Sequence, residues 1–140
     1  MEGEMAKDLI LYPVGRVRQG DGETHIEIFD KFTAALSGLA QFSHIYVLYW
    51  FHKNDDLEKR ATLKVHPRGN PKNPLTGVFA THSPVRPNLL ALSVCKIISV
   101  RDGTIRVDGI DAHDGSPVID IKGYFPNQLP EADIRLPDWA

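Results

Sequence analysis

Hydrophobic and polar side chains alternate in short runs along much of the chain, which is the pattern of half-buried β-strands. Residues 24–28 alternate strictly, and residues 90–100 carry Leu, Val, Lys, Ile and Val at successive positions of one face. Further strands are predicted over residues 9–18, 61–65, 77–81, 105–107 and 118–122. Seven or eight short strands joined by tight turns predict an all-β fold, either a barrel or a sandwich.

One run, residues 42–51, is apolar almost without interruption. A strand with one face in water would alternate, so this run predicts a strand that is covered on both faces. A barrel interior would cover one face, and another layer or a second subunit would cover the other.

Glycine-containing turns separate these runs. Gln19-Gly20-Asp21-Gly22 and Arg101-Asp102-Gly103-Thr104 predict hairpin turns, because glycine adopts positive φ without steric cost. Gly109 interrupts the alternation and predicts a bulge. One short helix is predicted, with Asp30 as its N-cap and Gly38 at its end. A parallel α/β sheet would need helices between its strands, and the pattern lacks them.

At 140 residues, 42% of them hydrophobic, the chain fits one domain, 1–140, with its core over about residues 9–126. No apolar run approaches the roughly 18 residues of a membrane span, and the charged N-terminus is unlike a secretion signal. The one cysteine, Cys95, excludes an internal disulfide and a four-cysteine zinc site, and it fits a reducing cytoplasm. We interpret it as a buried structural thiol rather than a nucleophile. The net charge of −2 excludes a generally basic nucleic-acid-binding protein.

Common catalytic motifs are missing from the sequence. It contains neither GxxxxGK(S/T) nor a GxGxxG between a strand and a helix, so a Rossmann-type nucleotide site is not expected. Its six histidines are not spaced as HxH or HxxxH, so we expect no metal and interpret them as hydrogen-bonded side chains.

Three loops carry polar residues that a purely structural barrel would not need. His52-Lys53 ends the long apolar run. Residues 81–88 hold two prolines, which stiffen the backbone that presents Arg86 and Asn88. Residues 111–117 follow the predicted bulge and contain an Asp-Gly pair that allows a tight turn. Ordinary Pro/Gly turns are the alternative interpretation of all three loops.

Residues 58–72 carry a local excess of positive charge. Lys59, Arg60, Lys64, Arg68 and Lys72 oppose Glu58 alone, an excess of four charges in a chain whose net charge is −2. Such an excess suits a partner that bears phosphates. A solvated loop is the alternative.

Three segments in this order resemble the signatures of the TrmO (TsaA-like) family: FSHIYVLYWFH at 42–52, GVFATHSPVRPN at 77–88 and DGSPVIDIKGY at 114–124. The resemblance extends over about residues 9–126. It implies a closed or nearly closed β-barrel of short antiparallel strands, a non-Rossmann methyltransferase that uses S-adenosylmethionine. It also implies a homodimer with the cofactor near the subunit interface, and N6-methylation of threonylcarbamoyladenosine in the anticodon loop of tRNA.

The resemblance further implies roles for individual residues. Asp111 and Asp114 would meet the ribose hydroxyls and amino group of the cofactor, and backbone groups of Ala112 and His113 its adenine. A base that collects the N6 proton would be His113 or Asp114. The full set of expected cofactor contacts is His52, Lys53, His82, Leu92, Asp111, Ala112, His113 and Asp114. Substrate contacts are expected from Lys64, Arg68, Arg86, Asn88, Lys122 and Tyr124.

Two departures from the family keep other functions open. His82 stands where the family has arginine, and the family's Pro-Arg-Gln motif has no counterpart near the N-terminus. The alternatives are a module that binds S-adenosylmethionine without turnover, and a methyltransferase that acts on a small molecule or a protein. A cytoplasmic location, without metal or membrane, is expected throughout.

Overall fold

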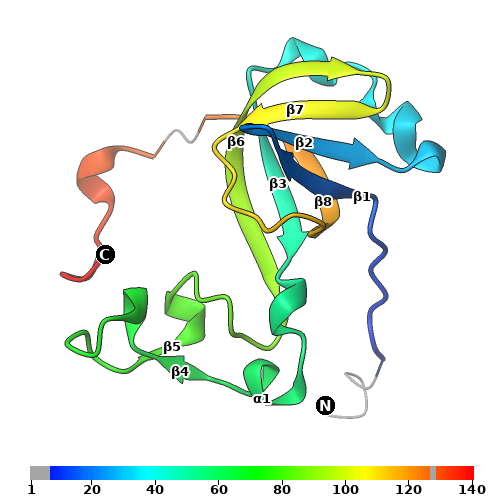
Figure 1. The fold of residues 1–140 in the computed structure, drawn as a ribbon. Helices are drawn as coiled ribbons and strands as arrows, with labels where there is room; N and C mark the ends of the chain where they lie inside the picture. The colour runs from blue at the N-terminus through cyan, green and yellow to red at the C-terminus, as the bar shows by residue number, and fades with distance from the viewer. Residues whose placement is uncertain (1–6, 127–128) are drawn as a thin grey trace.

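A computed structural model describes residues 7–126 and 129–140 of the chain. Six antiparallel strands close into a barrel in the order β1–β2–β7–β6–β3–β8 (Figure 1). They are β1 (Gly15–Gly20), β2 (Glu23–Ile28), β3 (His44–Trp50), β6 (Leu90–Arg101), β7 (Thr104–Asp108) and β8 (Pro117–Gly123). The predicted all-β barrel of short antiparallel strands is therefore confirmed.

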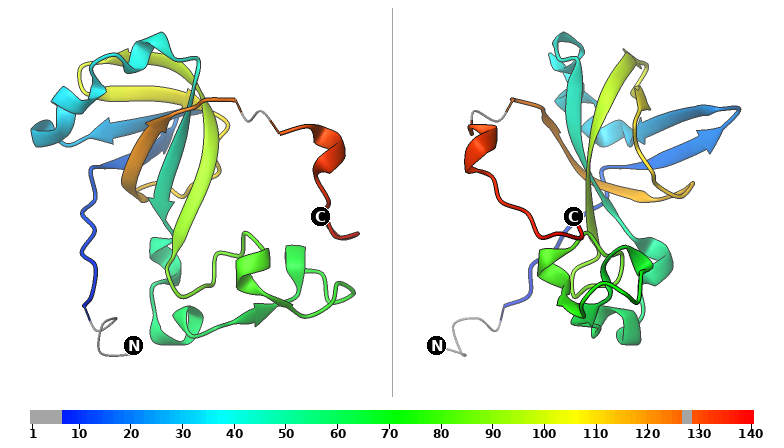
Figure 2. Two further views of the ribbon diagram at one scale, coloured as in Figure 1. Left: turned by 180° about the vertical axis from the view of Figure 1, so that it is seen from behind. Right: turned by 90° about the vertical axis from the view of Figure 1, so that its left-hand side faces the viewer.

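The residues between β3 and β6 form a small lobe beyond one end of the barrel (Figure 2). Its two-stranded sheet pairs β4 (Lys64–Val65) with β5 (Thr76–Gly77), and its only α-helix is α1 (Leu57–Arg60). Three 3₁₀-helices complete it: His52–Asn54, Pro67–Gly69 and Val78–Ala80. The C-terminal segment leaves the barrel after β8 and ends against this lobe, whereas the N-terminal segment runs down another side (Figure 1).

Both predicted hairpin turns are present. Asp21 and Gly22 have φ values of 53° and 73°, and Asp102 and Gly103 have 51° and 74°. Two consecutive residues with positive φ match the twist of the flanking strands, which explains the Asp-Gly pair in each turn. The predicted bulge at Gly109 is misplaced: Gly109 follows the end of β7, and the register shift of the β6–β7 pair lies in β6, between Ile97 and Ser99.

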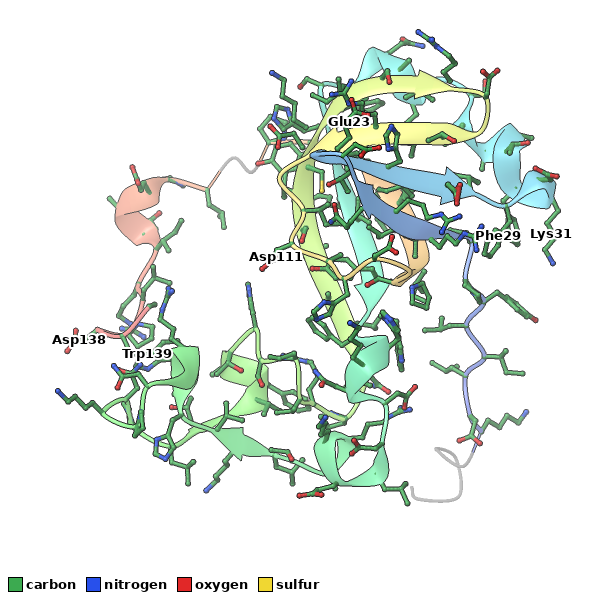
Figure 3. All side chains as sticks on the ribbon, in the orientation of Figure 1. Glu23, Phe29, Lys31, Asp111, Asp138 and Trp139 are labelled. Carbon is green, nitrogen blue, oxygen red and sulfur yellow. The ribbon has the colours of Figure 1, made fainter. Side chains whose placement is uncertain are left out.

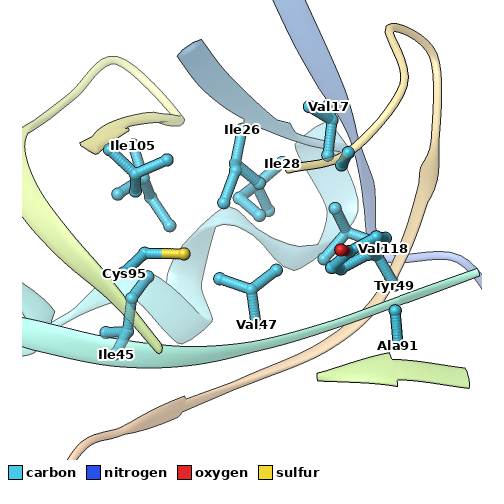
Figure 4. Packing of buried hydrophobic residues seen from close by; sticks show 12 residues of the cluster. Val17, Ile26, Ile28, Ile45, Val47, Tyr49, Ala91, Cys95, Ile105 and Val118 are labelled. Carbon is cyan, nitrogen blue, oxygen red and sulfur yellow. The ribbon is translucent and has the colours of Figure 1, made fainter. Parts of the chain in front are cut away.

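Inward-facing side chains of all six strands build one core (Figure 4). Ile26, Ile45, Val47 and Ile105 are completely buried within it, as is Cys95. Burial raises the pKa of the Cys95 thiol to about 11, and the Asp108 carboxylate adds to this shift. The thiol therefore stays protonated at neutral pH, as the interpretation of Cys95 as a structural residue requires.

The helix prediction is wrong in type and partly in position. Asp30–Leu36 forms a 3₁₀-helix rather than an α-helix, and Phe29 precedes it without a side-chain cap. Leu39–Gln41 forms a second 3₁₀-helix after Gly38, whose φ is 86°. The α-helix is instead α1, where Asp56 accepts a hydrogen bond from the Lys59 N–H. Four residues are too few to leave a periodic pattern in the sequence.

Three strand predictions are too long. Residues 9–14 lie outside any strand, and β1 begins only at Gly15. The predicted strand 61–65 shrinks to β4, whereas the prediction over 77–81 is wrong beyond Gly77, the last residue of β5, because Val78–Ala80 forms a 3₁₀-helix. Prolines 67, 71, 74 and 84 surround these segments, and each one removes a backbone donor that a longer ladder would need.

Strand β3 shows strict alternation of burial despite its apolar sequence. Ile45, Val47 and Tyr49 point into the core, whereas Tyr46 and Leu48 on the outer face are only half-buried. The described part of the chain provides no second layer over that outer face. Within a single chain, the prediction that both faces of this strand are covered therefore holds only for its inner face.

Gly15 marks the tightest backbone approach in the barrel. It pairs with Ile28, and a Cβ at this position would collide with the Glu27 carbonyl of the neighbouring strand. Gly20, at the other end of β1, has open space around it and an ordinary φ.

We expect Gly15→Ala to lower the free energy of unfolding by about 1–3 kcal/mol, because the two strands must move apart. Gly20→Ala, in the same strand, should change it by less than about 0.5 kcal/mol. Urea unfolding of both variants measures the difference. Equal stabilities would show that β1 and β2 are not packed as closely as described.

Candidate functional site

Three loops meet at the C-terminal end of β3. His52–Asn54 follows this strand directly, and the Asn54 side chain donates a hydrogen bond of 3.1 Å to the Pro84 carbonyl. The Tyr49 hydroxyl, near the end of β3, donates one of 3.2 Å to the Asp111 carbonyl. We call residues 51–54, 81–88 and 110–116 the loop cluster. All three loops singled out in the sequence belong to it.

The loop at 81–88 is held in shape by Arg86. Its Nη1 donates to the carbonyls of Thr81, at 3.0 Å, and Ser83, at 3.3 Å. Arg60 of α1, which lies outside this loop, donates a hydrogen bond of 2.9 Å to the Pro87 carbonyl. Together with the prolines, these bonds fix the backbone before any ligand arrives, which lowers the entropy lost on binding. Part of the Arg86 guanidinium is therefore engaged within its own loop.

The loop at 111–114 is fastened to the β1–β2 hairpin by Gln19. The Gln19 N–H donates to Asp114 Oδ1 at 2.8 Å, and its side-chain amide donates to the Ala112 carbonyl at 3.0 Å. Ser116 donates to the His113 carbonyl through its N–H, at 3.0 Å, and its hydroxyl, at 2.7 Å. The carbonyls of Ala112 and His113 therefore already accept hydrogen bonds within the chain. The loop also presents backbone N–H groups and the exposed side chains of His113 and of Asp111, which Figure 3 labels.

His52 carries an unsatisfied polar atom. Among the described side chains, its Nδ1 is the one buried nitrogen or oxygen without a hydrogen-bond partner. A buried polar atom without a partner costs free energy, and native proteins leave few of them. The neighbouring Lys53 is exposed. His52 Nδ1 is therefore a polar atom of the loop cluster for which the described residues supply no partner.

The two other expected cofactor residues, His82 and Leu92, lie in different parts of the structure. His82 is exposed within the loop cluster. Leu92 lies on the outer face of β6, opposite Leu48 of β3, and 59% of it is exposed. Its side chain therefore points away from the barrel interior, on a face that a second subunit could share with the cluster.

The expected substrate residues do not all come together in one chain. Asn88 is exposed in the loop cluster, and Lys64 lies on the lobe. Lys122 pairs in register with Tyr46, and the Tyr124 ring lies 5.2 Å from that of Tyr46. Both are near the start of β3, about 15–20 Å along the strand from its C-terminal end.

In the folded chain, ion pairs neutralise part of the positive charge of residues 58–72. Lys59 pairs with Asp56, at 3.7 Å, and Arg60 pairs with Asp55, at 3.3 Å. Arg60 also lies over the Trp50 ring, 5.4 Å from its centroid. The remaining cations, Lys64, Arg68 and Lys72, form no ion pair with a described residue.

Sequence reasoning missed the residues that hold the cluster together. Gln19 acts across more than 90 residues of chain, and Tyr49 across 62. Tyr49 lies in the apolar run 42–51 and Gln19 in the predicted hairpin turn, but neither pattern indicates which distant loop the side chain contacts. No group of three or more His, Cys, Asp or Glu side chains within 7–126 and 129–140 could hold a metal ion. Across the same residues, every helix is too short or too polar to cross a membrane.

The fold and the loop cluster define a small β-barrel protein whose candidate site is built from loops at one end. The model of the tRNA-methyltransferase O N-terminal domain matches residues 12–128, and the chain belongs to this family. The family assignment made from the three motifs is thereby confirmed.

Individual relatives agree with this assignment. A probable S-adenosyl-L-methionine-binding protein of Methanocaldococcus jannaschii is 51% identical over 112 residues, which are 80% of this chain and 89% of that protein. The human tRNA (adenine(37)-N6)-methyltransferase is 45% identical over 98 residues, 70% of this chain but 22% of the enzyme. The crystal structure of TrmO from Pseudomonas aeruginosa superposes with a TM-score of 0.70 at 29% identity, covering 95% of this chain and 62% of that one.

Proposed function

We propose that the protein is a methyltransferase that uses S-adenosylmethionine and acts on N6 of adenine 37 in tRNA. Membership of the TrmO family supports the reaction, and the names of relatives support cofactor and acceptor. The observation that carries the site is the loop cluster with the unsatisfied His52 Nδ1. We further propose that the adenosine bears threonylcarbamoyl, as the resemblance implies, and that the reaction takes place in the cytoplasm.

The residues of the loop cluster fit this cofactor. S-adenosylmethionine, when bound, supplies a methyl group on a sulfonium that an amine can attack. Asp111 presents a carboxylate for hydroxyl or amino groups, and His52 offers a ring nitrogen with no competing partner. Methyl transfer depends mainly on alignment, which two fixed loops can provide: 111–114, held by Gln19, and 81–88, held by Arg86.

His113 is the better placed of the two proposed bases. Asp114 Oδ1 already accepts the Gln19 N–H, whereas the exposed His113 side chain makes no hydrogen bond with another described residue. An imidazole can collect the N6 proton at neutral pH. We therefore assign proton acceptance to His113 and the shaping of the loop to Asp114.

We also propose a homodimer formed through the outer face of β3 and β6. Leu48 lies opposite Leu92, and Tyr46 opposite Val94, so these four side chains form a continuous apolar outer face. The outer face of β1, β2 and β7 is instead covered by ion pairs, such as Glu27 with Arg16 at 2.9 Å and Arg18 at 2.8 Å. These arginines, Arg16 foremost, hold the pKa of Glu27 below its usual value. An apolar face beside a charged one favours association through the apolar face.

One observation favours a second function, cofactor binding without turnover. His82 stands in the cluster where the resemblance leads us to expect arginine. A guanidinium is always charged and has five donors, and an imidazole cannot replace all of them.

Labelled methyl transfer distinguishes these functions. With methyl-labelled S-adenosylmethionine, we expect label in unfractionated tRNA and, after digestion, in an N6-methylated adenosine. Loss of label when the tRNA comes from cells that lack threonylcarbamoyladenosine would establish the finer substrate. Binding of the cofactor without label in tRNA would favour the binding module, and label only in an RNA-free extract would favour a small molecule or protein acceptor.

Asp114→Ala should weaken S-adenosylmethionine binding by about 1–3 kcal/mol, because the Gln19 N–H loses its acceptor and the loop loses its shape. Asp114→Asn keeps an oxygen for this bond and should retain most of the affinity. Calorimetric titration measures both, with Asp30→Ala as an exposed control away from the cluster. Unchanged affinity in Asp114→Ala would remove this loop from the cofactor site.

Leu92→Glu should convert the dimer to a monomer, because it places a charge in the middle of the apolar outer face. Leu57 is 90% exposed on α1, outside that face, so Leu57→Glu serves as the matched control and should stay dimeric. Sedimentation equilibrium gives the masses. A wild-type monomer, or a dimeric Leu92→Glu, would contradict the proposed interface.

A further inference from the structure

A cavity in the lobe adjoins the loop cluster and shares residues 81–84 with it. Its volume is about 800 Å³. Three segments line it: residues 65–69 and 80–84 of the lobe, and Leu136, Pro137, Trp139 and Ala140 of the C-terminal segment. Figure 3 shows Trp139 where this segment reaches the lobe.

The C-terminal segment is attached at this point by Arg68. Its Nε donates a hydrogen bond of 3.0 Å to the Trp139 carbonyl. Arg68 has a φ of 59°, an uncommon conformation for a residue other than glycine. The bond leaves the two terminal nitrogens of the guanidinium available at the wall of the cavity.

The wall of the cavity is mostly apolar, with one aromatic ring, that of the half-buried Trp139. Arg68 and His82 add nitrogen atoms that can face an anion, and so does Nε2 of His66, whose Nδ1 is hydrogen-bonded to the Asn73 carbonyl. No aspartate or glutamate side chain is among the lining residues. The unpaired Lys64 and Lys72 belong to the same lobe. Such a combination suits single-stranded nucleic acid, whose bases stack on aromatic rings and whose phosphates meet basic side chains.

The cavity is distinct from the expected cofactor contacts. Of those eight residues, His82 alone lines it. A group held in the cavity and a cofactor held by the loop cluster would therefore meet at His82. This is the arrangement that transfer between two bound molecules requires.

We propose that this cavity receives an unstacked nucleobase of the acceptor RNA, with the base on the Trp139 ring and the adjoining phosphate at Arg68. The volume suits a nucleoside, since ligand pockets commonly measure about 300–1,000 Å³. This inference rests on the proposed function, because it supplies the acceptor subsite of the same reaction.

Tryptophan fluorescence tests directly whether a nucleobase stacks on the Trp139 ring. The chain has two tryptophans, so Trp50→Phe leaves Trp139 as the reporter, and Trp139→Phe leaves Trp50 as the matched control. The probes are an anticodon stem-loop RNA with adenine at position 37 and the same RNA with an abasic site there. We expect the adenine RNA to quench Trp139 but not Trp50, and the abasic RNA to quench neither.

The second measurement is the affinity of the protein for the adenine RNA. Trp139→Ala should weaken binding of the adenine RNA about tenfold, with Trp139→Phe retaining most of the affinity. The affinity of both variants for S-adenosylmethionine should be unchanged, which also shows that they are folded. Equal affinity of the wild type for the two RNAs, or quenching of Trp139 by S-adenosylmethionine alone, would overturn the inference. Failure of the proposed function is distinguishable, because the wild type would then transfer no methyl group although its Trp139 responds to adenine.

Discussion

The register of β3 is the constraint on which the rest of the structure depends. This strand pairs with β6 on one side and β8 on the other, and so joins the two halves of the barrel. Its inward residues build the core, and its last inward residue, Tyr49, also holds the loop at 111–114. A shift by one residue would exchange the two faces. Val47 would then face solvent, and His52 would leave the loop cluster.

The outer face of β3 explains why its sequence does not look like that of a solvated strand. An antiparallel sheet with one wet face normally alternates apolar and polar residues. Here Tyr46 and Leu48 occupy outer positions that a strand in water would fill with polar residues. The same barrel does have polar residues on the outer face of β1 and β2. This difference within one sheet is what the proposed association through β3 and β6 would explain.

The barrel could be predicted from the sequence because its strands carry local signals. Alternation marks β2 and β6, and Asp-Gly pairs mark two hairpins, each within a few residues. The lobe could not be predicted in the same way, since strands of two residues and helices of three or four leave no periodicity. For a related reason, the net charge of residues 58–72 overstates the positive charge that this segment has in the folded chain. Asp55 and Asp56 lie just before this window, and they neutralise two of its cations only because α1 turns the chain back.

The candidate site, too, has features that short stretches of sequence predict and others that depend on contacts between distant residues. The three loops were found from sequence, because prolines mark the loop at 81–88, an Asp-Gly pair marks the loop at 111–117, and polar residues end the apolar run at His52-Lys53. Their convergence depends on hydrogen bonds made by Gln19, Tyr49 and Asn54 with residues 30 to 95 positions away. A residue that orients a distant loop needs only one amide or hydroxyl at one point in space, and many sequences supply that.

A site made of separate loops also suits a reaction between a small cofactor and a large RNA. A nucleotide site between a strand and a helix is enclosed by one continuous segment of chain, and it recognises phosphate through a helix N-terminus. In this protein the barrel supplies the 111–114 loop and the lobe supplies the 81–88 loop, so the two walls of the site belong to different substructures. Residues of the lobe can therefore change to suit an acceptor while the core of the barrel, from Ile26 to Ile105, stays the same. His82 lies in the 81–88 loop and also lines the cavity of the lobe, so in the proposed arrangement its side chain would bear on both molecules at once.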